Sequence, residues 1–290
     1  MQLHVYQAIW GMEGLPWRGE TPWTPEQQMD RIAEAGFDGI SMSFTADEAP
    51  LEWARLAIER DLRIQAQAFP RSVEELKPIF ETIEAVGREH VDHLSLQPNV
   101  RPPTLGEAIP YLLGWQRLAE DAGVPMYVET HRDRMTTDLL FTLQLIDAIP
   151  TLELTADLSH FLVGREFAWP VGEEEHELID RILRRSRAYH GRVASREQVQ
   201  IQISFPHHQP WLDLFAGWWR RGFAHFQATR FEGSILTFTT ELGPPDWYAI
   251  TGPDGREQSD RWAEALQLRD LARELWADVE RERATSAQLS

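Results

Sequence analysis

The feature that most constrains this chain is a regular alternation of strand-like and helix-like segments along all 290 residues. Short apolar segments rich in branched residues predict strands, and amphipathic segments predict helices between them. No Gly/Ser-rich or Pro-rich linker interrupts the alternation, so we expect one domain over residues 1–283 and a frayed tail over residues 284–290. The predicted strands are Leu3–Ile9, Gly39–Phe44, Arg63–Phe69, Val91–Gln97, Met126–His131, Leu152–Leu158, Ala188–Ala194 and Ile235–Leu242.

The predicted helices carry their own boundary signals. Thr24 and Gln27 form a capping box, and Gly36 predicts the end of the helix that begins there. Similar boxes begin at Ser72 and at Thr104. These signals separate the helices from the strands on either side and support the alternation.

Eight strand–helix pairs in a chain of this length fit a (β/α)8 barrel, and an open doubly wound sheet is the alternative. Strands of an open parallel sheet are buried on both faces and are nearly continuous apolar runs. Here many strands alternate instead, as where Leu94 and Leu96 flank Ser95. The polar face becomes more polar toward the carboxyl end of each strand, as expected where a barrel interior opens into a site. We therefore predict an α/β protein built as a single (β/α)8 TIM barrel.

The composition excludes several classes of protein. The formal net charge is −18, which argues against duplex DNA as the main partner because phosphate binding needs a basic face. Cysteine is absent, so disulfides, thiolate nucleophiles and cysteine-ligated zinc are excluded. No apolar run reaches the ~18 residues of a membrane-spanning helix, and the first residues do not resemble a secretion signal. We expect a cytoplasmic protein that binds neither nucleic acid nor membranes.

Candidate metal ligands stand at the carboxyl ends of the last four predicted strands. Glu129, Asp157, His190 and Glu241 are separated by 28, 33 and 51 residues, close to the ~30 residues of one βα unit. Any one of them alone is more often a structural or exposed residue. At matching heights on neighbouring strands, however, three carboxylates would raise one another's pKa unless a cation joined them. This oxygen-rich set suits one divalent ion: Mn2+ first, with Mg2+, Co2+ or Zn2+ as alternatives.

The motifs around these residues resemble those of the xylose isomerase-like TIM barrel superfamily, in its sugar and sugar-phosphate isomerase/epimerase branch. They are Glu129-Thr130-His131-Arg132, Asp157-Leu158-Ser159-His160, His190-Gly191-Arg192 and Glu241-Leu242-Gly243-Pro244. The resemblance implies that the first residues of the four motifs together bind a single metal ion. It implies as well that Glu129 and Glu241 are the acid–base pair. It also implies that His160, together with Arg192 or Arg196, contacts substrate oxygens.

The chemistry is coherent without that resemblance. Isomerising or epimerising a sugar requires removal of a proton beside a carbonyl, and a divalent cation stabilises the enediolate that forms. Two glutamates on opposite sides of the site can remove the proton and return it. We therefore expect a metal-dependent enzyme of carbohydrate metabolism that isomerises or epimerises a ketose or aldose.

Other residues are candidates for substrate contact. His131 lies two residues beyond Glu129 and so on the same face, where it would contact the substrate or a metal ligand. Trp10 begins a segment rich in glycine, proline and tryptophan that suits a lid, or alternatively a surface that packs on a neighbouring subunit. Ser43 stands where the better-known sugar epimerases often have a carboxylate. No Lys/Arg cluster is assigned to a phosphate, which favours an unphosphorylated substrate.

Several alternatives stay open. A dehydratase would share the enediolate and then expel a hydroxyl group. An endonuclease IV-like phosphodiesterase would need more histidine ligands and a basic face, and a non-catalytic sugar-binding barrel would bind without turnover. The sequence leaves open a homo-oligomer, either a dimer or a tetramer, and it leaves open the identity of the sugar.

Overall fold

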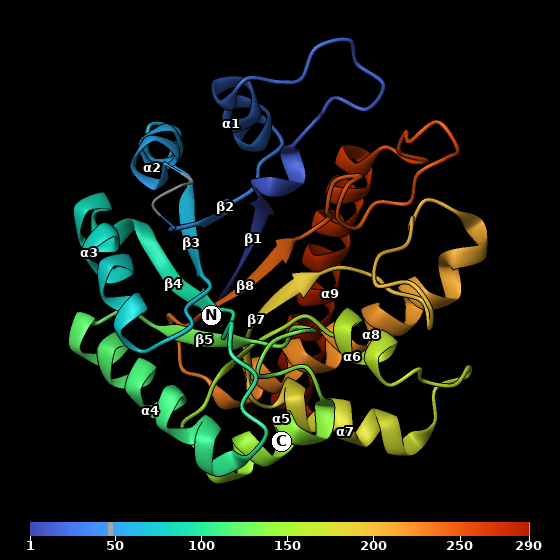
Figure 1. Ribbon diagram of the computed structural model, residues 1–290. Coiled ribbons are helices and arrows are strands. Elements are labelled where there is room, and N and C mark those ends of the chain that lie inside the picture. Colours follow the sequence, from blue (N-terminus) through green and yellow to red (C-terminus); the bar gives the residue numbers. More distant parts are fainter. Residues whose placement is uncertain (46–48, 290) are drawn as a thin grey trace.

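The protein folds as a closed barrel of parallel strands surrounded by helices (Figure 1). The computed structural model describes residues 1–45 and 49–289, with side chains to residue 286. The strands are β1 (Gln2–Ala8), β2 (Gly39–Ser43), β3 (Arg63–Ala68), β4 (Val91–Leu96), β5 (Met126–Glu129), β6 (Leu154–Ala156), β7 (Ser186–Gly191) and β8 (Ile235–Thr240). The α-helices are α1 (Pro25–Glu34), α2 (Pro50–Ile58), α3 (Lys77–Val86), α4 (Leu105–Ala122), α5 (Leu139–Ala148), α6 (Ser159–Gly164), α7 (Glu173–Leu183), α8 (Gln209–Thr229) and α9 (Arg261–Leu289).

The strands follow one another around the barrel in chain order, and β8 pairs with β1 to close it. Each of the eight pairs is parallel. This arrangement confirms the predicted (β/α)8 barrel and excludes the open doubly wound sheet, which would leave two strand edges unpaired.

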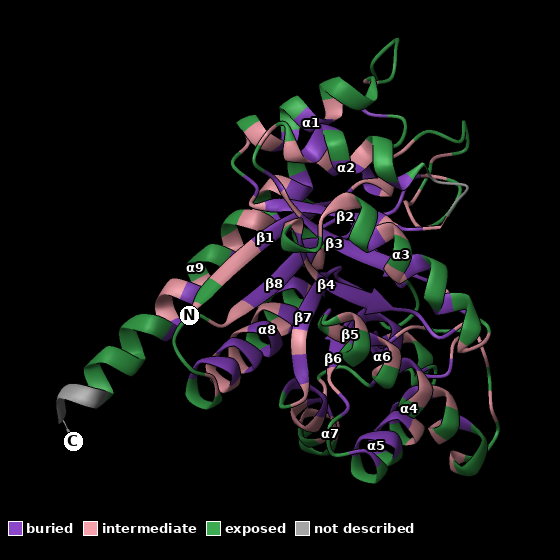
Figure 2. Ribbon diagram, turned by 90° about the vertical axis from the view of Figure 1, so that its left-hand side faces the viewer, coloured by how far each residue is buried: buried purple, intermediate pink, exposed green. Residues whose placement is uncertain are grey.

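The barrel staves are almost wholly buried, whereas the helices expose their outer faces (Figure 2). The main core lies between strands and helices, where Leu94, Leu96 and Val128 face outward beneath the helical layer. Two further buried residues, Trp218 and Trp219, come from α8, so both are core residues and not a platform for substrate. The inner strand faces are polar, which confirms the predicted alternation.

Helix boundaries agree with several sequence signals. Thr24 and Gln27 form the predicted capping box at α1, and Thr104 caps α4. At Ser72 the box instead introduces a short 3-10 helix, η3 (Glu74–Leu76), before α3 begins. Residues 284–289, predicted to be frayed, continue α9 (Figure 2).

Every predicted strand extends beyond the observed one at its carboxyl end. The largest excess is three residues, at β7, which was predicted to end at Ala194 and ends at Gly191. β5 ends at Glu129, two residues early, because the chain turns there and the His131 amide donates to Thr136 Oγ1 at 3.1 Å. Asp157 and Glu241 therefore lie directly after β6 and β8, on loops rather than within the ladder. Among the described helices, none combines the length and apolar character needed to cross a bilayer.

Candidate metal centre at the carboxyl end of the barrel

The four predicted metal ligands lie together at the carboxyl end of the barrel. Glu129 ends β5, His190 belongs to β7, and Asp157 and Glu241 follow β6 and β8. Each offers one donor atom, and these atoms all lie within 4.8 Å of one another. Glu129, Asp157 and His190 are fully buried, and Glu241 is 3% exposed. The group could therefore hold one metal ion.

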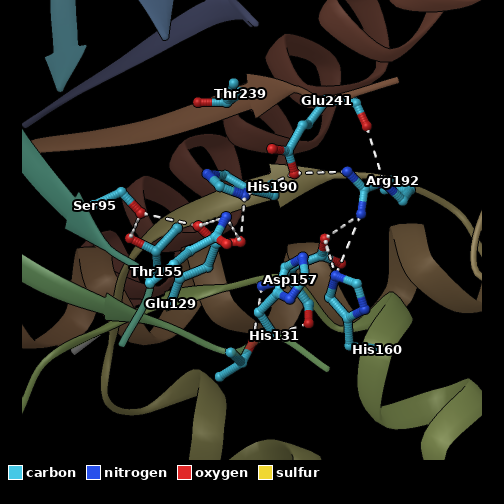
Figure 3. A network of polar contacts seen from close by, with 12 residues as sticks. Ser95, Glu129, His131, Thr155, Asp157, His160, His190, Arg192, Thr239 and Glu241 are labelled. Carbon is cyan, nitrogen blue, oxygen red and sulfur yellow. Dashed lines mark hydrogen bonds and ion pairs between the residues drawn. The ribbon is translucent and has the colours of Figure 1, made fainter. Parts of the chain in front are cut away.

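The net charge of the cluster and the unpaired His190 Nδ1 atom both fit a divalent cation. Three buried carboxylates carry three negative charges, and Arg192 supplies one positive charge by donating to Asp157 Oδ2 at 3.1 Å and to Glu241 Oε2 at 2.9 Å. A divalent ion would balance the remaining two. His190 Nδ1 lies 2.9 Å from Glu241 Oε2 and 3.5 Å from Glu129 Oε1, yet it makes no aligned hydrogen bond with the described residues. Its position suits a metal ligand (Figure 3).

Without a metal, this electrostatic arrangement favours a protonated His190. Burial alone would lower the pKa of His190, but the carboxylates of Glu241 and Glu129 raise it well above its usual value. Burial raises the pKa of Glu241, but His190 and Arg192 outweigh that effect and bring it to about 2. The pKa of Asp157 is lowered as well, since His160 and Arg192 overcome its burial. A metal must therefore displace a proton from His190.

The far side of the His190 ring contacts Gln65 of β3, with 3.1 Å between His190 Nε2 and the Gln65 amide nitrogen. A protonated or metal-bound ring carries a proton on Nε2, which requires an acceptor there. If the Gln65 amide is turned by 180°, its oxygen faces His190 Nε2 and accepts that proton. The Thr239 hydroxyl, which donates to the Gln65 oxygen in the orientation shown, then accepts from the Gln65 amide nitrogen. Gln65 thus orients the imidazole in either state.

Neighbouring polar groups fix two of the carboxylates. Gln97 Nε2 lies 3.0 Å from each Glu129 oxygen and donates to that carboxylate, and Ser95 donates to it at 3.4 Å. Ser159 donates its amide to Asp157 Oδ1 at 3.0 Å. From the sequence alone Gln97 had no assigned role, because its partner Glu129 lies 32 residues away along the chain.

Arg192 is buried in the centre of the site rather than reaching out to a free ligand. Besides its two carboxylate partners, it donates Nε to the Glu241 backbone oxygen at 3.1 Å. Its guanidinium lies 4.3 Å from the Tyr248 ring centroid and 5.8 Å from that of Trp10. Tyr248 is therefore part of the site, and the sequence reasoning missed it because its loop carries no recognisable motif.

The histidines expected to contact substrate lie beside the metal cluster. His160 Nε2 is 3.3 Å from Asp157 Oδ2, and its Nδ1 is buried with no hydrogen-bond partner among the described residues. His131 packs on His160 with ring centroids 4.0 Å apart, and its Nε2 lies 3.4 Å from the Tyr248 hydroxyl. Burial, together with the neighbouring His160, lowers the pKa of His131 to about 3, so its ring is neutral.

A cavity of about 620 Å³ opens above this cluster. Glu241, Arg192, His131 and Trp10 are among its lining residues, together with an aromatic wall that includes Trp247. The lining does not include Arg196, whose side chain is 44% exposed and lies 3.6 Å from Glu166. Of the two arginines considered from the sequence, the structure therefore places Arg192 in the site and Arg196 outside it.

Two further sequence candidates are also placed by the structure. Ser43 lines the cavity and shares a hydrogen bond of 3.0 Å with the Thr45 hydroxyl. The cavity therefore has a hydroxyl group, and not a carboxylate, at this position. The pair His207-His208 belongs to η5 (Pro206–His208), and His208 Nδ1 lies 2.7 Å from the Gln202 carbonyl. That pair does not join the metal cluster.

No family model matches the chain, and no curated protein matches it in sequence. Solved structures do match. A xylose isomerase-like TIM barrel protein from Mycobacterium smegmatis, in complex with magnesium, has a TM-score of 0.63 at 12% identity and covers 95% of this chain and 97% of its own. An L-ribulose 3-epimerase has a TM-score of 0.61 at 13% identity, covering 98% of each chain.

Three other solved structures that match are an epimerase, a dehydratase and an endonuclease by name. The 3-keto-D-glucoside 4-epimerase from E. coli has a TM-score of 0.56 at 12% identity, covering 93% of this chain and 99% of its own. A probable 3-DHS dehydratase from Bacillus anthracis and an AP endonuclease from Brucella melitensis each match with a TM-score of 0.53 at 13% identity, covering 83% of this chain and 93% of theirs. Identities this low show the fold alone: the chain has the fold of the xylose isomerase-like TIM barrels.

Proposed function

We propose that this protein is a divalent-metal-dependent isomerase or epimerase of a ketose or aldose. The observation that carries the proposal is the convergence of Glu129, Asp157, His190 and Glu241 within 4.8 Å beneath a polar and aromatic cavity. A bound divalent cation, with Mn2+ our first choice, would supply Lewis-acid stabilisation of negative charge on the substrate oxygens. The remaining chemistry belongs to the side chains.

In this proposal Glu129 and Glu241 exchange protons with the substrate. They reach His190 from β5 and from the loop after β8, and Figure 3 shows them on two sides of its ring. One carboxylate removes the proton beside the carbonyl, and the C–H electron pair enters the enediolate. The other returns a proton to the opposite face of that carbon, which epimerises it, or a proton is returned to the neighbouring carbon, which isomerises the sugar.

Groups around the two glutamates would bind the substrate oxygens. Neutral His131 lines the cavity. His160 packs against His131 and is buried, and its Nδ1 has no partner among the described residues, so it would act from behind the cavity wall. Arg192 holds Asp157 and Glu241 in place and stabilises negative charge near the cavity floor. Trp10 and Tyr248 close over the guanidinium and provide apolar walls for a sugar ring.

The donor set favours this chemistry over phosphodiester cleavage. The cluster contains one imidazole and three carboxylates, whereas an endonuclease IV-like site needs more histidines and a basic face. The chain carries a net charge of −18. We therefore propose a small carbohydrate substrate and no nucleic-acid partner.

Substitution of Glu241 by Gln tests the acid–base role. With Mn2+ bound, wild-type protein should exchange solvent deuterium into a reactive ketose from a panel, and Glu241→Gln should slow this exchange by about 100-fold or more. The measurement is NMR of the exchanged position, with circular dichroism to check folding. A matched control, Glu232→Gln, changes an exposed glutamate before β8 and should exchange at the wild-type rate.

Unchanged exchange in Glu241→Gln would refute the two-glutamate mechanism. The mass of the product separates the remaining enzyme alternatives, because isomerisation and epimerisation conserve mass whereas a dehydratase product loses water. Tight binding without exchange or turnover, in any of the divalent metals, would instead indicate a non-catalytic sugar-binding barrel.

A further inference from the structure

The cavity has a cationic side that the proposed reaction does not use. Arg134, on the loop after β5, lines the same cavity as Glu241. Its side chain is 19% exposed, and its Nε is buried with no hydrogen-bond partner among the described residues. One terminal nitrogen donates to the backbone oxygen of Asp133 at 2.9 Å. Most of the guanidinium's donors are therefore free to bind a ligand.

The carboxylate nearest to Arg134 is already engaged. Asp133 accepts two hydrogen bonds of 2.6 Å from Arg101, in the paired geometry that arginine and carboxylate prefer. Arg134 NH1 stays 3.6 Å from Asp133 Oδ2. Arg132 lies over the Tyr248 ring at 5.0 Å and adds a third cation to the same rim. Arg101 and Arg134 thus share one aspartate, in a protein whose net charge is −18.

The other charges of the cavity are either committed or distant. Arg192 is neutralised by Asp157 and Glu241. Glu13, which also lines the cavity, follows β1, and β1 stands opposite β5 in the closed order of the strands. The cavity therefore has an acidic floor at the candidate metal cluster and a positive charge, that of Arg134, on its β5 side. A ligand with a negative end would be held in one direction only.

Resting on the proposed function, we propose that the sugar substrate carries an anionic group, a carboxylate or a phosphate, at the end remote from the reacting carbons, and that Arg134 binds this group. A guanidinium matches either anion with two parallel hydrogen bonds, and partial burial reduces competition from water. The sequence alone favoured an unphosphorylated substrate because it shows Arg132 and Arg134 beside each other but does not show that Arg134 lines the cavity.

Three unreactive polyols of the same carbon skeleton test this assignment. D-glucitol is neutral, D-gluconate carries a carboxylate, and D-glucitol 6-phosphate carries a phosphate. Binding of each is measured by isothermal titration calorimetry, both with Mn2+ and after treatment with EDTA. We expect at least one anion to bind about tenfold or more tightly than D-glucitol, as a charge-assisted hydrogen bond would provide. The anion that binds more tightly identifies the source of the charge.

Substitutions then assign the preference to a residue. Arg134→Met should bind all three polyols with equal affinity, and Arg134→Lys should retain part of the preference because the charge remains. Arg281→Met removes a cation that is 69% exposed on α9 and should leave the preference unchanged. Circular dichroism confirms that each variant is folded.

Two results would overturn the proposal: no preference for either anion in the wild type, including no binding at all, or a preference that survives in Arg134→Met. The second result would indicate that the anion binds the metal or another cation. None of the three compounds has an aldehyde or ketone group, so these measurements do not depend on turnover. Failure of deuterium exchange would refute the proposed reaction and leave the assignment of Arg134 to be judged by its own binding data.

Discussion

The buried carboxylates of the candidate metal cluster cost stability but could serve the function of the site. Burying three carboxylates is costly, and an ion pair in the interior seldom recovers the whole desolvation cost. Glu129 nevertheless accepts from Gln97, and Glu241 from Arg192, so that each carboxylate is held in one orientation. This arrangement stabilises the fold less than apolar packing would, and it creates a site for a cation.

Asp92 on β4 is a further carboxylate whose side chain is only 5% exposed, and here its role is structural. It accepts from Arg63 at 2.8 Å and lies 2.9 Å from His4 Nδ1, and the Tyr6 hydroxyl donates to it as well. Burial would raise the pKa of Asp92, but these partners lower it from 3.8 to about 2. The network ties three strands together at the amino-terminal end of the barrel, away from the cavity.

Replacing Asp92 by Asn should therefore destabilise the protein in a pH-dependent way. The lowered pKa means that the ionised carboxylate stabilises the fold above pH 3.8, by about 2 kcal/mol, and that this contribution is lost as the pH falls toward 2. Urea unfolding should show a large difference between wild type and Asp92→Asn at pH 7 and a smaller one at pH 3. Asp254→Asn, in an exposed turn, should show no difference, and a pH-independent effect of Asp92→Asn would contradict the assignment.

At the scale of elements, the first residue of α9 anchors the loop after β1. Arg261 is 3% exposed and donates to the backbone oxygens of Gly11 and Glu13, the latter at 2.8 Å. Glu257 holds the guanidinium at 2.8 Å. The loop that carries Trp10 over the cavity is therefore fastened to a helix about 250 residues later in the chain.

Removing this anchor should loosen the loop while the barrel stays closed. In Arg261→Met the backbone oxygens of Gly11 and Glu13 lose their donor, and the buried Gly11 oxygen costs about 1–3 kcal/mol when it is left unpaired. Hydrogen exchange followed by mass spectrometry should become faster in peptides that cover residues 10–23. Arg269→Met is a matched control, because Arg269 also lies on α9 and donates to the Ala35 backbone oxygen. If that control accelerated exchange in the same peptides, or if Arg261→Met did not, the anchoring role would be wrong.

The loop after β8 is also held by a side chain from another part of the chain. Gln200 accepts from the Gly243 amide at 2.7 Å and donates to the Gly243 oxygen at 3.1 Å. A side chain at Gly243 would collide with Trp10 and Tyr248, since a Cβ atom there would lie 2.6–2.8 Å from their rings. Glycine at this position therefore allows the two aromatic rings to approach the site.

On the scale of the whole molecule, closure of the barrel brings the four candidate metal ligands together. The four ligands come from β5 to β8, so a bound cation would link four neighbouring staves. A ligand that binds only the folded state stabilises it by mass action, by about 2.7 kcal/mol at a concentration of 100 times Kd.

Removal of metal should therefore lower the melting temperature without unfolding the barrel. For a domain of this size, Mn2+ at 100 times Kd should raise Tm by about 5 °C above the EDTA-treated protein. Differential scanning calorimetry measures the shift. Asp157→Asn should abolish it, whereas Asp278→Asn on α9 should preserve it. An equal shift in Asp157→Asn would mean that the cation binds elsewhere.

The barrel and the set of four ligands could be predicted because both follow from local periodicity. Strand spacing near 30 residues places strand ends at one height, and side chains that alternate along a strand reveal which face is polar. Glu129, Asp157, His190 and Glu241 were therefore identified before any coordinates. Strand ends were less predictable, because side chains such as Thr136 end β5 from positions beyond it.

Contacts between distant loops had no such signal. Gln97 with Glu129, Gln200 with Gly243 and Arg261 with Gly11 join residues 32, 43 and 250 positions apart. Nothing in the spacing of an arginine reveals whether it faces solvent, as Arg196 does, or binds two buried carboxylates, as Arg192 does.

The amino-acid sequence by itself thus determined the barrel and the chemistry of its rim, because hydrophobic periodicity and the order of strands are local properties of the chain. Only the tertiary structure decided which side chains compete for the same charge and which are left free for a ligand. The physical reason is that electrostatic interactions and burial depend on distances in space, and those distances are set by the closed ring of strands.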